Sequence, residues 1–173
     1  MIFEFEGRVP KISEKAYVHE SAVVIGDVTL SDGVYVGPNA TIRGDYGTIV
    51  IGENSAVEDN VVIHARPGEK TTIGCCVTIG HGSIIHTATI KDYAVIGMGS
   101  IVTDYAVVGK WAVLAEGSVV KIRQVVDDET IVAGVPAQPK GKVNDDYKKQ
   151  WTEFKGIYVS FCERYKKNLK RIG

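Results

Sequence analysis

Three of the four histidines in this 173-residue chain lie within a short stretch, at His64, His81 and His86. Neutral imidazole is a common ligand for divalent transition metals and can also serve as a general base near neutral pH. Charged residues precede the histidines in the segments Arg43-Gly44-Asp45 and Glu58-Asp59. The grouping therefore indicates metal-assisted or acid–base chemistry, provided that the fold brings these side chains together.

The histidines lie inside a six-residue repeat of aliphatic side chains, most of them followed four residues later by a small residue. A period of six fits neither a helix nor a simple alternating strand. It does fit short β rungs joined by tight corners and coiled into a solenoid. The repeat positions, which predict six three-sided coils, are Ile12, Val18, Val24, Leu30, Val36, Ile42, Ile51, Val57, Ile63, Ile73, Ile79, Ile84, Ile90, Ile96, Val102, Val108, Leu114 and Val120.

The repeat also suggests where the histidines point. Arg43, His64 and His86 each follow an aliphatic residue that should point inward, so β alternation directs them outward on one side of three consecutive coils. His81 belongs to a different side and would not meet the other two within one chain. In a cyclic trimer of parallel prisms, the His81 side of one subunit would meet the His64 and His86 side of the next. The prediction is a three-histidine site that exists only at subunit boundaries.

The period changes near the carboxyl end, after a Gly- and Pro-containing segment at 132–139. From Tyr147 to Ile172 apolar residues recur every three or four positions, which predicts one amphipathic helix with Asn144 or Asp145 as its N-cap. The charged residues of this segment, Lys155 among them, are expected on the solvent side. The sequence thus predicts a mainly β chain, with a β-helix domain at 1–142 and a C-terminal α-helix at 143–173 packed along it.

Composition limits the classes of partner. The formal net charge is −1 and 45% of residues are hydrophobic, which suits one domain with a full core and gives no sign of nucleic-acid or membrane binding. Three cysteines, two of them adjacent at Cys75 and Cys76, make no disulfide framework. Neither a signal peptide nor an apolar run long enough to span a membrane is visible. We therefore expect a soluble cytoplasmic protein.

The strings that hold the arginine and the histidines, together with Ile96-Gly97-Met98-Gly99-Ser100 and the closing Ala133-Gly134-Val135-Pro136-Ala137, closely resemble gamma-class carbonic anhydrases over nearly the whole chain. The resemblance implies a left-handed parallel β-helix of hexapeptide repeats and a homotrimer. It implies Zn²⁺, or else Fe²⁺ or Co²⁺, held by His64 and His86 of one subunit and His81 of its neighbour.

The same resemblance implies a reaction and supporting residues. Three neutral imidazoles leave a coordination position open, where metal-bound hydroxide would attack carbon dioxide to give bicarbonate and a proton. The protein would then be a lyase, a carbonic anhydrase whose small-molecule partner is carbon dioxide or bicarbonate. The residues expected to support the subunit interface are Arg43, Asp45 and Asp59.

The chain departs from the family pattern around the expected site. Glu58 stands where well-studied members have glutamine, and it is expected to orient the hydroxide. Tyr46 and Pro67 stand where those members have glutamates, one of them a proton shuttle. Homologues with shortened loops carry a tyrosine in the terminal helix, for which Tyr158 is the best match. Glu58 and Tyr158 are therefore the candidate catalytic residues, although Tyr158 fits a core position on the aromatic stripe equally well.

Two other functions fit the same residues. The chain could be a hexapeptide-repeat acyltransferase that uses His81 or His86 as general base on an acyl-CoA in an inter-subunit cleft. It could also be a metal-stabilised trimeric scaffold with little or no turnover. A single essential histidine would suffice for the acyltransferase, whereas the metal site requires all three.

Overall fold

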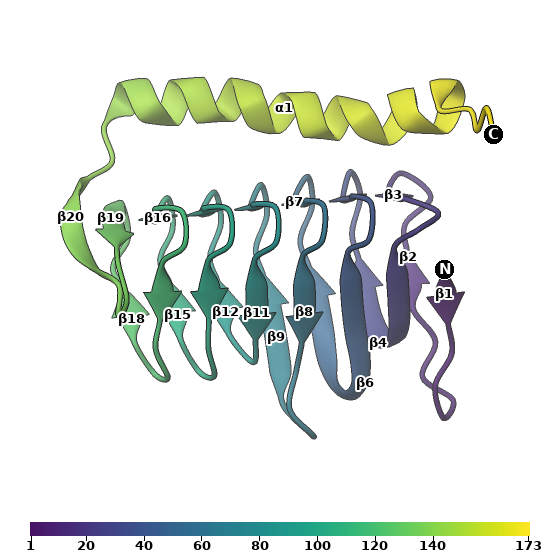
Figure 1. Cartoon of the computed structure of the whole chain (residues 1–173), viewed down its shortest axis with the longest axis horizontal. Helices are drawn as coiled ribbons and strands as arrows, with labels where there is room; N and C mark the ends of the chain where they lie inside the picture. Colours follow the sequence, from purple (N-terminus) through teal and green to yellow (C-terminus); the bar gives the residue numbers. More distant parts are fainter.

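A computed structural model describes residues 1–173 and shows a parallel β solenoid with one long helix along its side (Figure 1). Every strand of the coils pairs in parallel with its counterpart in the next coil, and the last strand alone runs antiparallel. The predicted fold, a parallel β-helix of hexapeptide repeats with a C-terminal helix, is confirmed. The coils have three faces, each built from the strands given next.

The first face contains β1 (Ile2–Phe3), β8 (Val62–His64), β11 (Ile84–His86), β14 (Ile101–Val102) and β17 (Val119–Val120). The second face contains β2 (Lys11–Ile12), β9 (Lys70–Ile73), β12 (Thr89–Ile90), β15 (Val107–Val108) and β18 (Val125–Val126). Two longer strands, β4 (Val23–Leu30) and β6 (Thr41–Ile51), bend from the first face into the second and join them. The third face contains β3 (Tyr17–Val18), β5 (Tyr35–Val36), β7 (Ala56–Val57), β10 (Thr78–Ile79), β13 (Val95–Ile96), β16 (Val113–Leu114), β19 (Thr130–Ala133) and the antiparallel β20 (Gln138–Lys142).

The core is a column of aliphatic side chains stacked from coil to coil. Ile42 pairs with Ile63, and Ile63 pairs with Ile85, all three with no exposed surface. Stacking buries what a single rung would leave in water, at about 25 cal/mol per Å² of apolar surface. Val126 and Val132 are also buried, so the repeat continues for one coil beyond the six that were predicted.

Two irregularities differ from the predicted positions. Ile85 points inward and Ile84 is exposed, so the short step of the repeat falls after Ile85 rather than before Ile84. The extra residues after Ile42 do not loop out, because β6 carries them around the corner in one continuous strand. Gly26 and Gly44 permit this bend, since a Cβ on Gly26 would lie 2.3 Å from the Gly44 carbonyl oxygen. The segment 65–69 does leave the coil and projects beyond the neighbouring corners (Figure 1).

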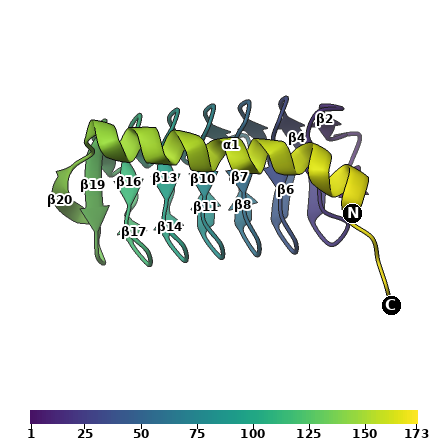
Figure 2. The same cartoon turned by 90° about the horizontal axis from the view of Figure 1, so that it is seen from above.

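The helix α1 (Asp145–Asn168) runs back along the whole third face, from β19 past β16, β13 and β10 (Figure 2), and contacts β7, β5 and β3. Asn144 is its N-cap, since the side-chain oxygen accepts a hydrogen bond from the Tyr147 amide at 2.8 Å. No helix of the chain has the length and apolarity needed to cross a bilayer.

The helix packs through two aromatic groups. Near its carboxyl end Tyr158, Phe161 and Tyr165 pack on Tyr17 and Tyr35 of the first two coils. Near its start Tyr147 and Trp151 pack on Val95, Val113 and Val143. The predicted stripe is thus correct for these residues. It is wrong for Phe154, Leu169 and Ile172, which are exposed. It is also wrong for Lys155, which is only 5% exposed and lies against the solenoid.

Candidate functional site

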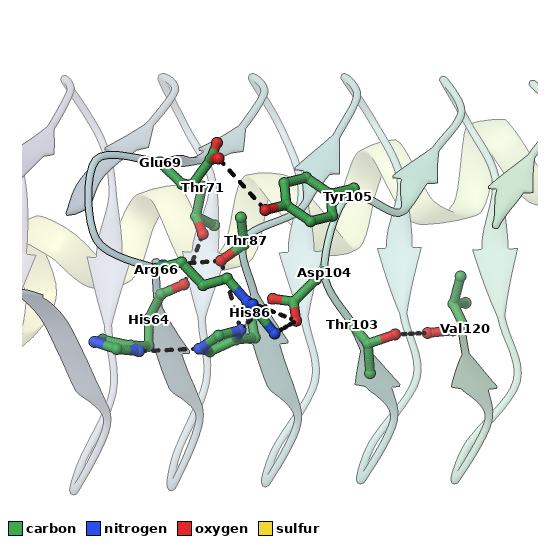
Figure 3. Close-up of polar contacts among 10 residues, drawn as sticks. All are labelled: His64, Arg66, Glu69, Thr71, His86, Thr87, Thr103, Asp104, Tyr105 and Val120. Carbon is green, nitrogen blue, oxygen red and sulfur yellow. Dashed lines mark hydrogen bonds and ion pairs between the residues drawn. The ribbon is translucent and has the colours of Figure 1, made fainter. Parts of the chain in front are cut away.

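His64 and His86 lie side by side on the first face, at the ends of β8 and β11 (Figure 3). The strand register aligns Arg43, His64 and His86 on three consecutive coils. Nδ1 of His64 lies 3.0 Å from Nε2 of His86. The repeat therefore brings two imidazoles into direct contact from positions 22 residues apart.

Each imidazole is held by an aspartate on its far side. Nε2 of His64 lies 2.9 Å from an oxygen of Asp45, and Nδ1 of His86 lies 2.5 Å from an oxygen of Asp104. Asp45 follows Arg43 in β6, whereas Asp104 comes from the corner after β14. The result is a row of four side chains, Asp45, His64, His86 and Asp104, in which each member makes a close polar contact with the next.

Arginines keep the two aspartates ionised. Burial by itself would raise the pKa of Asp104, but hydrogen bonds from Arg66 and His86 outweigh it and hold that pKa below its usual value of 3.8. Burial opposes ionisation of Asp45 in the same way, and contacts with Arg43 and His64 lower its pKa. Arg66 approaches Asp104 through both Nε, at 2.9 Å, and Nη2, at 2.7 Å. Both carboxylates therefore stay ionised and can each accept a hydrogen bond from the ring that faces them.

The contacts define the protons on the two rings. Because each ionised carboxylate accepts a hydrogen bond, the ring nitrogen facing Asp45 and the one facing Asp104 each carry a hydrogen. If both rings are neutral, the two nitrogens that face each other carry none. If one ring takes a further proton from the N–H or O–H group of a bound molecule, that proton would form a hydrogen bond between His64 and His86. This arrangement suits a general base that consists of two rings with fixed tautomers.

Contacts from the loop between β8 and β9 fix Arg66 and the strand that carries His64 (Figure 3). The Arg66 amide donates to Thr87 Oγ1 at 2.9 Å, and Thr71 Oγ1 donates to the His64 carbonyl oxygen at 2.7 Å. These two hydrogen bonds, each of which involves a backbone group, therefore help to hold the row of Asp45, His64, His86 and Asp104 in place.

His81 belongs to a second group, at the end of the third face. Its Nε2 lies 3.1 Å from Glu58 Oε2, and its Nδ1 lies 3.5 Å from Asp59 Oδ2. The Asp59 amide donates to the same Nδ1 at 3.3 Å, so the ring presents Nε2–H to Glu58. Tyr158 adjoins this group. Burial raises its pKa first, and a hydrogen bond with Glu58 raises it further.

A groove of about 470 Å³ runs from this second group along the third face and beneath the start of α1. Glu58 and His81 line its polar end, and Tyr147 and Trp151 line the side that α1 covers. Apolar side chains of the coils form most of the remaining wall.

The predicted site residues thus divide into two groups within one chain. Within the chain Arg43 pairs with Asp45, and Asp59 lies beside His81. Two residues of this row were not predicted: Asp104, which contacts His86, and Arg66, which pairs with Asp104. Asp104 had a signal in the sequence, since β14 pairs with β11 and so places the following corner beside His86. Arg66 lies in the projecting loop, which the repeat does not position.

Comparison with known proteins identifies the family. The chain is 38% identical over 144 residues to the carnitine operon protein CaiE of Escherichia coli O157:H7, a match that covers 83% of this chain and 74% of CaiE. It is 30% identical, with a TM-score of 0.90, to a hexapeptide transferase family protein from Anaplasma phagocytophilum, over 95% of this chain and 97% of that one. The chain belongs to the hexapeptide-repeat β-helix family.

Two other similarities bear on this hexapeptide-repeat protein. Residues 46–152 match the family model of the GMPPB C-terminal domain. A hexapeptide-repeat acetyltransferase from Vibrio cholerae, solved with acetyl coenzyme A, is 26% identical with a TM-score of 0.53, and the match covers 65% of this chain and 72% of that one. The similar proteins of this family are thus named as transferases or as CaiE.

These findings overturn the predicted carbonic anhydrase. The similar proteins are named as transferases and as CaiE rather than as lyases that hydrate carbon dioxide. Zn²⁺, Fe²⁺ or Co²⁺ as cofactor is also wrong, because no group of three or more His, Cys, Asp or Glu side chains in the chain is arranged so that it could hold a metal ion. Acetyl coenzyme A is the molecule in the Vibrio structure. His81, which was to be the third ligand, turns toward Glu58 and Asp59.

Proposed function

We propose that this protein transfers an acyl group from a coenzyme A thioester to an amine or hydroxyl acceptor, with His86 as the general base. The observation that carries the proposal is the 2.5 Å contact between His86 Nδ1 and Asp104, an ionised carboxylate held by Arg66. A carboxylate in this position fixes the tautomer and leaves Nε2 free of a proton. The named transferases of the family support the choice of reaction.

The reaction follows from that arrangement. His86 Nε2 takes a proton from the acceptor as its nitrogen or oxygen attacks the thioester carbonyl carbon. The carbon–sulfur bond then breaks, and the coenzyme A thiolate leaves and receives the proton from His86. The neighbouring His64, held by Asp45, stabilises the protonated His86 ring by accepting a hydrogen bond from it.

We infer that three copies of the chain assemble and that each site lies between two of them. His64 and His86 have side chains 15% and 34% exposed on the first face, and His81 is 45% exposed at the end of the third. In a threefold assembly of parallel prisms these two faces meet. Arg43, Asp45 and Asp59 would support that interface, and Glu58 and Tyr158 would act as positioning residues for His81.

Activity of matched variants tests the proposal. The purified protein is given acetyl coenzyme A with a panel of small amines and alcohols, and released thiol is measured. His86→Ala should lower the rate by a factor on the order of 10² to 10⁴, the usual contribution of a general base. His19→Ala is the control, because the His19 ring hydrogen-bonds to Ser21, packs edge-on against Tyr17 and lies on the first coil, away from His86. Equal rates in the two variants would contradict the assignment of His86.

Coenzyme A binding gives a second readout. Calorimetry with coenzyme A alone should show binding in the wild type and in His86→Ala, because the base is not required to hold the donor. If the wild type binds no coenzyme A and releases no thiol with any acceptor, acyl transfer is not the function of this protein.

A further inference from the structure

Lys155 is a buried amine that the proposed reaction does not use. It extends from the middle of α1 onto the third face and is 5% exposed. Its Nζ donates to Thr78 Oγ1 at 3.0 Å and to the Ala94 carbonyl oxygen at 3.4 Å, and it lies 5.5 Å from the centre of the Trp151 ring. No carboxylate forms an ion pair with it, in contrast to Lys148 of the same helix, which pairs with Glu129 at 2.7 Å.

This environment favours the neutral amine. Burial lowers the pKa of Lys155 to about 7, and the charges of Cys76 and Glu58, which favour the ammonium, offset burial only in part. Roughly half of the molecules therefore carry an unprotonated Lys155 at pH 7, against fewer than about one in a thousand for an ordinary lysine. Only the unprotonated amine is a nucleophile.

Lys155 is one of the residues that line a small pocket open to the outside. The pocket measures about 290 Å³ and lies where α1 crosses the corner between the second and third faces. Cys76 and Tyr93 line it on the solenoid side, and Lys155 and Gly156 line it on the helix. A Cβ on Gly156 would meet no atom within 4 Å, so the backbone there leaves room beside the lysine. Ligand pockets generally begin at about 300 Å³, so this one fits a short acyl group and not a whole nucleotide.

We propose that Lys155 is a self-acylation site, at which Nζ attacks the carbonyl carbon of a short-chain acyl thioester of coenzyme A that enters this pocket. A carbon–nitrogen bond forms and the carbon–sulfur bond breaks. The thiolate of coenzyme A leaves and takes the proton that the nitrogen loses. The amide product is uncharged and keeps one N–H, which can still donate to Thr78 or Ala94. Acylation thus replaces a buried ionisable group with a neutral one.

The site is separate from the proposed catalytic row. Lys155 lies beneath α1 on the third face, whereas His64 and His86 lie on the first face. The acyl thioester is the same class of donor, but attack by Lys155 requires no acceptor and no general base. The two proposals can therefore fail independently of each other.

Site-resolved mass spectrometry tests the assignment. The intact protein is incubated with acetyl coenzyme A at pH 7, then digested, and acetylation is measured at each lysine over time. Lys155 should be acetylated at least about ten times faster than Lys148 and the exposed Lys167, because about half of Lys155 is unprotonated at pH 7. Equal rates at the three lysines, or no acetylation at Lys155, would overturn the proposal.

The pH dependence of the acetylation rate and the length of the acyl chain give two further tests. The rate at Lys155 should level off above about pH 7, whereas the rate at an ordinary lysine rises toward pH 10. Cys76 and Glu58 are the ionisable groups that act on the pKa of Lys155. Octanoyl coenzyme A should label Lys155 at least about tenfold more slowly than acetyl coenzyme A, because the pocket is small. A profile parallel to that of Lys148 would contradict a neutral nucleophile at this position.

Two variants identify the attacking atom. Cys76 lines the same pocket and is itself a nucleophile, so Cys76→Ser must keep the label on Lys155 if Nζ attacks directly; loss of the label would overturn direct attack. His86→Ala should also keep the label. That variant separates the two proposals, because it removes the proposed base without touching the pocket at Lys155.

Discussion

Replacement of Lys155 by methionine should stabilise the protein at neutral pH and destabilise it at high pH. Methionine has similar length and no charge. The shift of the Lys155 pKa from 10.5 to about 7 corresponds to about 5 kcal/mol of unfavourable burial at roughly 1.4 kcal/mol per pKa unit. Methionine also gives up the two hydrogen bonds of Nζ, each contributing about 1 kcal/mol. The net gain expected at pH 6.5 is therefore about 3 kcal/mol.

The sign of the pH dependence follows from proton binding. The folded-state pKa of Lys155 is lowered, so between about pH 7 and 10.5 the unfolded chain holds a proton that the folded chain lacks. The stability of the wild type therefore rises with pH across that window and is independent of this group below it. The advantage of Lys155→Met should shrink by roughly 4 kcal/mol between pH 7 and pH 10 and end about 1 kcal/mol in favour of the wild type.

Urea unfolding, followed by tryptophan fluorescence at fixed protomer concentration, measures this difference at pH 6.5, 8 and 10. Lys148→Met is the matched control, since Lys148 lies on the same helix and pairs with Glu129 near solvent. That control should change stability by less than about 1 kcal/mol, the usual limit for a surface ion pair, at each of the three pH values. If Lys155→Met proves less stable than the wild type at pH 6.5, or if the difference does not vary with pH, the account of Lys155 is wrong.

Two further outcomes test other parts of the structure. Asp104→Asn should lower the unfolding free energy at pH 7 by about 1 to 3 kcal/mol, the range for hydrogen bonds to a charged group. Because the pKa of Asp104 is lowered in the folded state, the difference in unfolding free energy between variant and wild type should narrow as pH falls below 3.8. Unfolding measured over a series of acidic pH values would reveal this. Asn144→Ala should lower the unfolding free energy by about 1 kcal/mol through loss of the N-cap, and Asn144→Ser should restore the Tm measured by calorimetry. An unchanged Tm in the alanine variant would show that the cap contributes nothing.

The solenoid could be predicted from the sequence because each coil repeats the environment of the one before it. Residues at equal repeat positions become neighbours, which is why the contact between His64 and His86 follows from counting alone. The seventh coil, which includes the buried Val126 and Val132, was not predicted because the Gly- and Pro-containing segment that begins at Val132 was taken as the end of the repeat. The repeat thus predicts what lies on a face and fails at corners and ends.

The remaining features depend on contacts that no period describes. Arg66 reaches Asp104 from a loop that leaves the coils. Lys155 was expected in solvent, as lysines usually are, but the small buried Ala56 and Thr78 leave room beneath the helix for its long side chain. The function was mispredicted because the spacing of three histidines was taken to define a metal site, although the contacts each ring makes within its chain are set by carboxylates on neighbouring coils.

The reversed direction of β20 affects how the molecule ends. A stack of parallel strands closes with a row of unpaired amide and carbonyl groups, on which another molecule could add its own strand and start a fibre. Here β20 folds back over β19, and Pro139 within it lacks an amide hydrogen (Figure 1). β20 thereby covers the open edge of the third face at the last coil, which hinders the addition of a further parallel strand on this face.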